Sequence, residues 1–165
     1  MIAVSDSSPL IALSRIGYLE LLRRLFDAVH IPTEVYNEVV IAGTGRPGAD
    51  SVARASWIKV TPVQAMADLK KALEETGLGS GEVAAVQLAR ELGVEVILLD
   101  ERKARSHAEG AGLVVFGCVG ILEMLHRNGA LIDLRSAYAR LVEQKFRIDL
   151  TTLQRSLLDC KLPPL

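Results

Sequence analysis

The chain has 165 residues, of which 50% are hydrophobic and 24% charged, and its formal net charge is −1. This composition excludes a disordered or low-complexity chain and supplies enough apolar groups for the core of one domain, which we expect to span residues 1–165. The near-neutral charge excludes a protein that holds nucleic acid by bulk electrostatic attraction, so such a function would need a local patch or bound metal ions.

Short apolar runs alternate with segments of helical periodicity along the chain. Capping hydroxyls at Ser7 and Ser8 begin the first helix and Gly17 ends it, while the glycines of 43–48 mark a loop. In chain order we predict a strand at 2–5, helices at 7–16 and 18–26, a strand at 28–31, a helix at 33–42, a loop at 43–48, a helix at 50–56, a strand at 58–60, helices at 63–76 and 82–92, a strand at 95–99, a helix at 101–111, a strand at 113–116, and helices at 119–127, 134–144 and 153–159.

This alternation predicts the fold class. Strands joined by helices make right-handed crossovers, which build a parallel sheet covered on both faces. We therefore expect a three-layer α/β/α fold with a central, mostly parallel sheet of about five strands. The helices from about residue 130 are an extension that serves core packing or an interaction surface.

Targeting and cysteine signals are weak. Cys118 and Cys160 lie far apart and have neither disulfide-framework nor zinc-ligand spacing. No apolar run approaches the ~18 residues of a membrane span, and no basic leader followed by an apolar stretch opens the sequence. We therefore expect a cytoplasmic protein with no membrane partner.

Two aspartates follow predicted strands directly. Asp6 comes after the strand at 2–5, and Asp100 after the strand at 95–99. Ligands of open parallel sheets bind outside the carboxyl ends of strands, near the point where strand order reverses. We expect Asp6 and Asp100 to face one another there. The alternative for each is simple helix capping, for which Asp is also favoured.

Two glutamates lie at helix positions that suit the same site. Glu38 follows Glu34 by one helical turn, and a nearby cation would remove the repulsion between these like charges. Glu82 begins a helix after the turn 79–81, in which Ser80 is the expected cap and glycine lets the backbone pass close to another group. The alternatives are a solvated acidic face for Glu34 and Glu38, and a favourable contact with the helix dipole for Glu82.

Four carboxylates are a set that hard divalent cations accept. Mg²⁺ and Mn²⁺ prefer oxygen ligands and keep several waters, and a bound ion activates water and neutralises a phosphodiester. The absence of a histidine constellation argues against Ser-His-Asp or zinc chemistry. The sequence thus favours metal-dependent phosphodiester hydrolysis.

Four segments carry a family resemblance, and they occur in the family's order. They are Val4–Ile11, Ile31–Val39, Gly79–Ala89 and Leu98–Arg105, and they resemble the acidic motifs of PIN-domain nucleases. The last, with its Asp-Glu-x-x-Ala-Arg pattern, is similar to the prokaryotic PIN-like branch related to the VapC toxins. The resemblance covers about residues 1 to 125.

The resemblance implies an activity and a metal site. It implies an endoribonuclease that uses Mg²⁺ or Mn²⁺, with RNA as the substrate. It further implies the toxin of a toxin–antitoxin pair, often a homodimer neutralised by a cognate antitoxin protein. Carried over by position, the catalytic and metal-binding acids would be Asp6, Glu38, Glu82 and Asp100.

Residues next to these acids take supporting roles in the same comparison. Ser7 or Ser8 would orient Asp6 as an outer hydroxyl. Many relatives have a further acid where this chain has Lys103, and this departure puts a second metal ion in doubt.

Three charged residues beside Asp100 are further candidates. Glu101 is a possible substitute for the acid that Lys103 replaces. Arg102 and Arg105 are candidates for phosphate contacts or for pairing with the acids, because a guanidinium matches phosphate oxygens, although a solvated helix face explains them equally well.

Two other functions stay open from the sequence. One is a Mg²⁺-dependent phosphoacceptor or phosphatase domain, although a haloacid-type phosphatase needs an Asp where this chain has Ser8. The other is a catalytically silent PIN-like interaction module, for which the Leu-rich helices of 134–165 would supply the surface.

Overall fold

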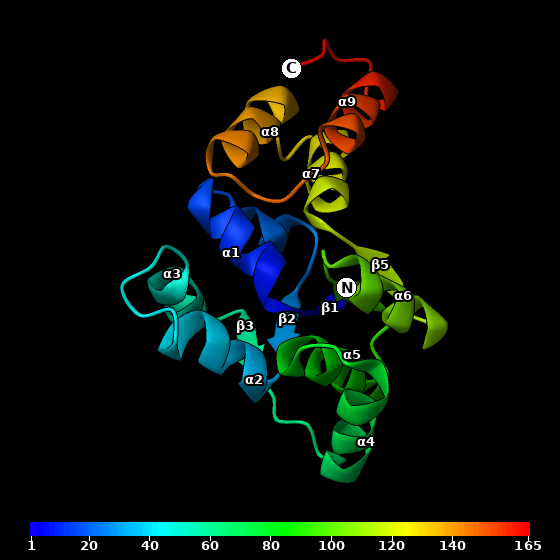
Figure 1. Ribbon diagram of the computed structural model, residues 1–165. Helices are drawn as coiled ribbons and strands as arrows, with labels where there is room; N and C mark the ends of the chain where they lie inside the picture. The colour runs from blue at the N-terminus through cyan, green and yellow to red at the C-terminus, as the bar shows by residue number, and fades with distance from the viewer.

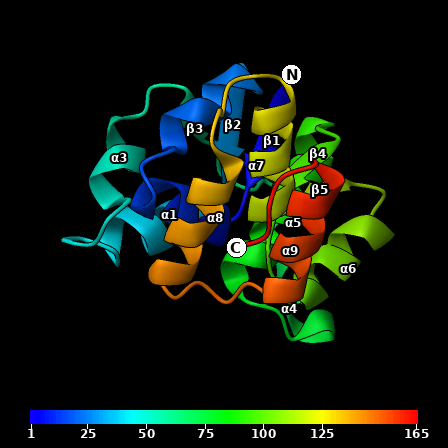
Figure 2. The ribbon, with the colours of Figure 1, turned by 90° about the horizontal axis from the view of Figure 1, so that it is seen from above.

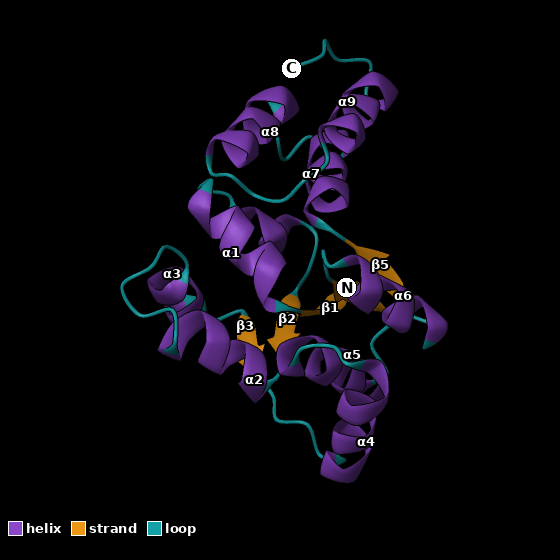
Figure 3. Cartoon of the chain, in the orientation of Figure 1, coloured by secondary structure: helices purple, strands orange, loops and turns teal.

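A five-stranded, entirely parallel sheet forms the centre of the computed structural model, which describes all 165 residues. Its order is β3-β2-β1-β4-β5, so the chain moves outward from β1 on one side and then returns to build the other side (Figure 3). Strand order therefore reverses between β1 and β4, where Ser5 pairs with Leu98. The strands are β1 (Ile2–Ser5), β2 (Ala28–Ile31), β3 (Ile58–Val60), β4 (Val96–Leu98) and β5 (Val114–Phe116).

Helices cover both faces of the sheet, as Figure 1 shows with α7, α8 and α9 above it and α4 and α5 below. Seen from the side of α8 and α9, the helices α1, α7, α8 and α9 cross over the strands (Figure 2). The first face carries α1 (Ser7–Arg15), the 3₁₀ helix η1 (Leu19–Arg24), α3 (Ala49–Arg54), α7 (Cys118–Arg127), α8 (Leu134–Glu143) and α9 (Leu150–Asp159). The opposite face carries α4 (Met66–Thr76), α5 (Ser80–Leu92) and α6 (Arg102–Gly110).

Alternation along the strands divides the core into two layers. Ala3 and Leu98 point into the larger buried cluster, which also contains the apolar faces of α1 and α7–α9. Val4 and Ile97 point into the smaller cluster beneath α4, α5 and α6. A strand buried on both faces needs apolar residues at successive positions, and this is why β1 and β4 are continuous apolar runs. The C-terminal helices α8 and α9 share the larger cluster with the sheet.

The predicted fold class is confirmed, and most element boundaries agree within one or two residues. The main difference lies in the segment between β2 and α3, which we predicted as one helix. It consists of α2 (Thr33–Tyr36) followed by the π-helical turn η2 (Asn37–Ile41), in which the Ala42 N–H donates to the Asn37 carbonyl at 2.7 Å. A Cβ atom on Gly43 would run into the carbonyl oxygen of Val39, so the wide turn depends on glycine there.

None of the helices combines the length and hydropathy that a bilayer crossing requires.

Candidate active site

Asp6 lies at the carboxyl end of β1, beside the point where strand order reverses between β1 and β4. Its backbone N–H donates to the Leu98 carbonyl at 3.0 Å, which extends the β1–β4 ladder by one residue. Asp6 also occupies the N-cap position of α1, yet its side chain makes no capping hydrogen bond to that helix. Asp6 is only 4% exposed, so it is a buried acid whose side chain does not cap α1.

The electrostatic surroundings of Asp6 disfavour its charge. Burial raises the pKa of the Asp6 carboxyl from its ordinary 3.8 to about 7. The nearby backbone N–H of Ser7 opposes this rise, and the carboxylates of Glu38, Glu82 and Asp100 add to it. The other three predicted acids therefore lie close enough to Asp6 to act on its charge.

Glu38 meets Asp6 above Gly81, and the three residues form what we call the acid cradle. A Cβ atom on Gly81 would lie 2.9 Å from Oε2 of Glu38 and 3.3 Å from Oδ1 of Asp6. Both oxygens thus border the same small space in the first turn of α5. Glu38 lies in η2, a π-helical turn of the kind often found at functional sites. The expected close approach of backbone in the 79–81 turn is therefore present at Gly81.

Asp100 follows β4, and Cys118, which comes after β5, holds its carboxylate. Its Oδ1 accepts the backbone N–H of Cys118 at 2.7 Å, and its Oδ2 accepts the Cys118 thiol at 3.2 Å. Burial, followed by the neighbouring Asp100 carboxylate, raises the pKa of the Cys118 thiol well above its ordinary range, so the thiol is a protonated donor at neutral pH. Cys118 was not among the residues that the sequence indicated for this site.

Glu82 contributes charge to the site and also caps its own helix. Its Oε2 accepts the Gly79 N–H at 2.9 Å. Gly79, and not Ser80 as we predicted, is the N-cap residue of α5, which begins at Ser80. Because glycine has no side chain to complete a capping box, Glu82 alone caps the helix, through the N–H of Gly79, and this role is independent of any ligand.

The residues predicted to support the acids differ in burial and in hydrogen bonding. The hydroxyl of Ser7 is buried next to Asp6 and has no hydrogen-bond partner, whereas Ser8 is exposed. Glu101 caps α6 by accepting the Ala104 N–H at 2.7 Å. Glu34 is not the solvated residue that its spacing favoured, because its Oε2 is buried without a partner.

Of the two arginines, Arg105 lies near the acids. Its Nη1 would be 2.9 Å from a Cβ atom on Gly117, and Oδ1 of Asp100 would be 2.8 Å from the same atom. The two side chains nevertheless form no ion pair. Arg102 is exposed at the start of α6.

The acids gather at one edge but do not close around a single point. No three carboxylate, imidazole or thiol groups converge closely enough to hold one ion as they stand. Asp6 and Glu38 border the acid cradle, while Glu82 and Asp100 use oxygens on the backbone donors of Gly79 and Cys118. Like charges repel, and these neutral backbone donors satisfy one oxygen of Glu82 and one of Asp100.

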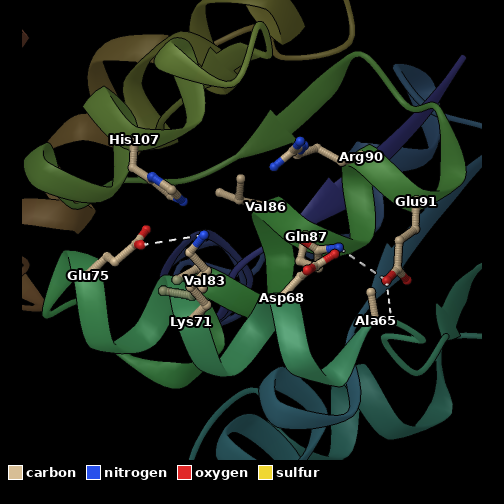
Figure 4. A pocket seen from close by; sticks show the side chains of 11 residues that line it. Ala65, Asp68, Lys71, Glu75, Val83, Val86, Gln87, Arg90, Glu91 and His107 are labelled. Carbon is tan, nitrogen blue, oxygen red and sulfur yellow. Dashed lines mark hydrogen bonds and ion pairs between the residues drawn. The ribbon is translucent and has the colours of Figure 1, made fainter.

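A surface hollow lies away from these acids. It has a volume of about 610 Å³ and runs between α4 and α5, with His107 of α6 at one end (Figure 4). Its polar side chains largely engage one another, for example Lys71 with Glu75 and Gln87 with Glu91. None of the four acids lines it, so the candidate active site is the edge of the sheet and not this hollow.

Comparison with known proteins identifies the family. A family model described as DUF3368, PIN domain, matches residues 2–161, which is nearly the whole chain. The chain belongs to the PIN-domain family. Proteins with PIN domains are generally nucleases and typically bind divalent metal ions. The family that the sequence motifs resembled is therefore confirmed.

A solved structure supports the PIN fold. The crystal structure of PAE2754 from Pyrobaculum aerophilum resembles this chain with a TM-score of 0.53 and 18% sequence identity, covering 79% of this chain and 100% of that one. At this identity the likeness concerns the fold alone. The curated proteins compared with the chain contain no match.

The side chains of this PIN domain fit a hard divalent cation. The candidate ligands offer oxygen atoms only, and two of them border one cradle that a single Cβ atom would fill. The hydroxyl of Ser7, the residue after Asp6, is buried without a partner, which costs about 1–3 kcal/mol unless a water or ligand meets it. Mg²⁺ is usually held by only one or two carboxylates together with waters, so Asp6 and Glu38 suffice as direct ligands.

Proposed function

We propose that this PIN-domain protein is a Mg²⁺- or Mn²⁺-dependent endoribonuclease that hydrolyses phosphodiester bonds in RNA. The observation that carries the proposal is the acid cradle, in which Asp6 and Glu38 meet above Gly81 at the carboxyl edge of the parallel sheet. The PIN family supports the nuclease class, and the oxygen-only donor set supports the choice of metal.

Each acid has a role that follows from its position. Asp6 and Glu38 would hold the ion, while Asp100 and Glu82 add negative charge beside it. The ion, when bound, would lower the pKa of a water molecule and neutralise charge on the scissile phosphate. Its positive charge would also favour the ionised form of Asp6, offsetting the effects of burial and of the neighbouring carboxylates.

In this proposal the arginines of α6 would contact the substrate. Arg105 lies beside Asp100 without forming an ion pair, which leaves its guanidinium free for a phosphate oxygen. Arg102 is exposed one turn earlier on the same helix and would contact RNA further from the reacting bond. In-line attack by water would leave 5′-phosphate and 3′-hydroxyl ends.

We further propose that the protein acts in the cytoplasm as the toxin of a toxin–antitoxin pair, as a homodimer that a cognate antitoxin neutralises. Exposed apolar side chains on and beside the C-terminal helices offer a surface for such contacts: Ile132 is 90% exposed and Leu158 is 73% exposed. Coexpression with the product of a neighbouring gene should suppress RNA cleavage if that product is the antitoxin.

The activity is tested with the full chain and a labelled RNA. Cleavage should require Mg²⁺ or Mn²⁺, stop on addition of EDTA and yield 5′-phosphate ends. Asp6→Asn and Glu38→Gln should each lower kcat by more than about 100-fold, which exceeds the 10–100-fold typical of residues one step away from a metal. Glu74→Gln, an exposed substitution on α4, is the matched control and should cleave like the parent.

Two results would contradict the proposal. Cleavage that persists in Asp6→Asn would show that this site does not take part in RNA hydrolysis. A parent protein that binds Mn²⁺ but cleaves no RNA would instead favour the silent interaction module.

A further inference from the structure

The turn between β5 and α7 contacts both oxygens of the Asp100 carboxylate. Cys118 supplies both donors: its backbone N–H to Oδ1 at 2.7 Å and its thiol to Oδ2 at 3.2 Å. A Cβ atom on Gly117 would lie 2.8 Å from Oδ1 of Asp100, so the backbone at this position comes too close for any other residue without a shift. We call Gly117 and Cys118 the Asp100 clamp.

The Asp100 clamp restricts the last side-chain torsion of Asp100, which on its own has only a weak preference. The terminal torsion of an Asp side chain has broad, roughly two-fold preferences, so one hydrogen bond leaves the carboxylate plane free to turn. Two donors on the two oxygens fix that plane. Gly117 is the N-cap residue of α7 and Cys118 is its first residue, so the carboxylate also lies at a helix N-terminus, where negative charge is favoured.

Core packing does not account for this contact. Cys118 is 1% exposed and belongs to the larger buried cluster, and a buried cysteine often serves as a small apolar residue. If packing were its whole role, Val or Ala would serve equally well at this buried position. The thiol lies within hydrogen-bond distance of a carboxylate oxygen, and an apolar side chain could not make this contact.

We propose that Cys118 is a positioning residue for the cation site: its thiol holds the Asp100 carboxylate in the orientation that adds to the charge around the ion. This inference rests on the proposed function, because it assigns Asp100 to a divalent-cation site. Residues that orient metal-site carboxylates typically change metal affinity by 10–100-fold when they are removed.

The test uses two substitutions of Cys118 in the full chain. Cys118→Val keeps an apolar group of similar size and removes the S–H donor, whereas Cys118→Ser keeps a donor. The dissociation constant for Mn²⁺ is measured by electron paramagnetic resonance, and kcat and KM for RNA are measured separately. Cys118→Val should weaken Mn²⁺ binding by about 10-fold or more and lower kcat at unchanged KM, and Cys118→Ser should recover most of both.

The second cysteine provides the control and a spectroscopic readout without metal. Cys160→Val, at the end of α9, should leave Mn²⁺ affinity unchanged. In that background the infrared S–H stretching band belongs to Cys118 alone. It should lie below the frequency of a free thiol and shift upward in Asp100→Asn, because the acceptor loses its charge.

The outcomes separate this inference from the proposed function. Wild-type Mn²⁺ affinity in Cys118→Val, or an infrared band that Asp100→Asn does not move, would overturn the role of Cys118 and leave the nuclease proposal standing. A parent protein that binds no Mn²⁺ would overturn both.

Discussion

Asp6 should make the metal-free protein less stable as the pH rises. In the unfolded chain its carboxyl loses a proton near its ordinary pKa of 3.8, whereas in the folded protein the pKa is about 7. Between these two values the folded state binds more protons than the unfolded state, so the free energy of unfolding falls with increasing pH. The side chain is 4% exposed, and solvent therefore does not screen this penalty appreciably.

The magnitude follows from the difference between the two pKa values. Each pKa unit corresponds to about 1.36 kcal/mol, so the full loss is on the order of 4 kcal/mol, of which about 3 kcal/mol falls between pH 5 and pH 8. Other groups titrate in the same range, so the effect of Asp6 must be isolated as a difference. Asp6→Asn removes this titration while keeping the shape of the side chain.

Urea unfolding of the parent and of Asp6→Asn, in EDTA at pH 5 and at pH 8, measures that difference. Relative to the parent, Asp6→Asn should gain about 3 kcal/mol of stability on going to the higher pH. Mg²⁺ should stabilise the parent at pH 8 and have little effect on Asp6→Asn. Asp50→Asn, an exposed substitution on α3, is the matched control, and its stability relative to the parent should not change with pH. An equal gap between Asp6→Asn and the parent at both pH values would refute the reasoning.

Three further substitutions test the site and the core. Gly81→Ala should lower Mn²⁺ affinity by about tenfold or more while changing the melting temperature little, because its Cβ atom crowds only the carboxylate ends of Glu38 and Asp6 and makes an ordinary contact with Val35. Gly110→Ala, in open space on α6, is the control and should leave the affinity unchanged. Glu82→Gln should keep the capping hydrogen bond to Gly79, so its free energy of unfolding should stay within about 0.5 kcal/mol of the parent's. It should nevertheless weaken Mn²⁺ binding, because it removes a negative charge. Equal Mn²⁺ affinity of Glu82→Gln and the parent would show that helix capping is the whole role of Glu82. Leu122→Ala in the fully buried face of α7 should lower the free energy of unfolding by about 2–5 kcal/mol in a urea titration, and a loss below about 1 kcal/mol would contradict the packing of α7 against the sheet.

Local patterns predicted the fold because each layer of this protein follows its own periodicity. The bounds of β1, β2 and β3 agree with the predicted ones: β1 is a short apolar run that is largely buried, whereas β2 and the edge strand β3 alternate between more and less buried positions or end exposed. Asp6 and Asp100 were found as candidates because the end of a parallel strand is fixed as soon as the strand is identified.

Other features depend on contacts that lie far apart in sequence, and no local pattern reveals them. Cys118 meets Asp100 across 18 residues, and the only local signal was a glycine directly after the strand at 113–116. The turn of η2 depends on Gly43 and on the Ala42 N–H reaching one residue further back than in an α-helix, which helical periodicity does not distinguish. The buried oxygen of Glu34 depends on how α2 packs, and sequence spacing alone favoured a solvated residue.

The position of a bound ion tests the central claim most directly. A crystal of the full chain grown or soaked with Mn²⁺ and measured at the manganese absorption edge should give an anomalous difference peak within coordination distance of Asp6 and Glu38, above Gly81. Anomalous peaks that are confined to other parts of the surface, or none at saturating Mn²⁺, would contradict the assignment of this sheet edge as a metal-dependent nuclease site.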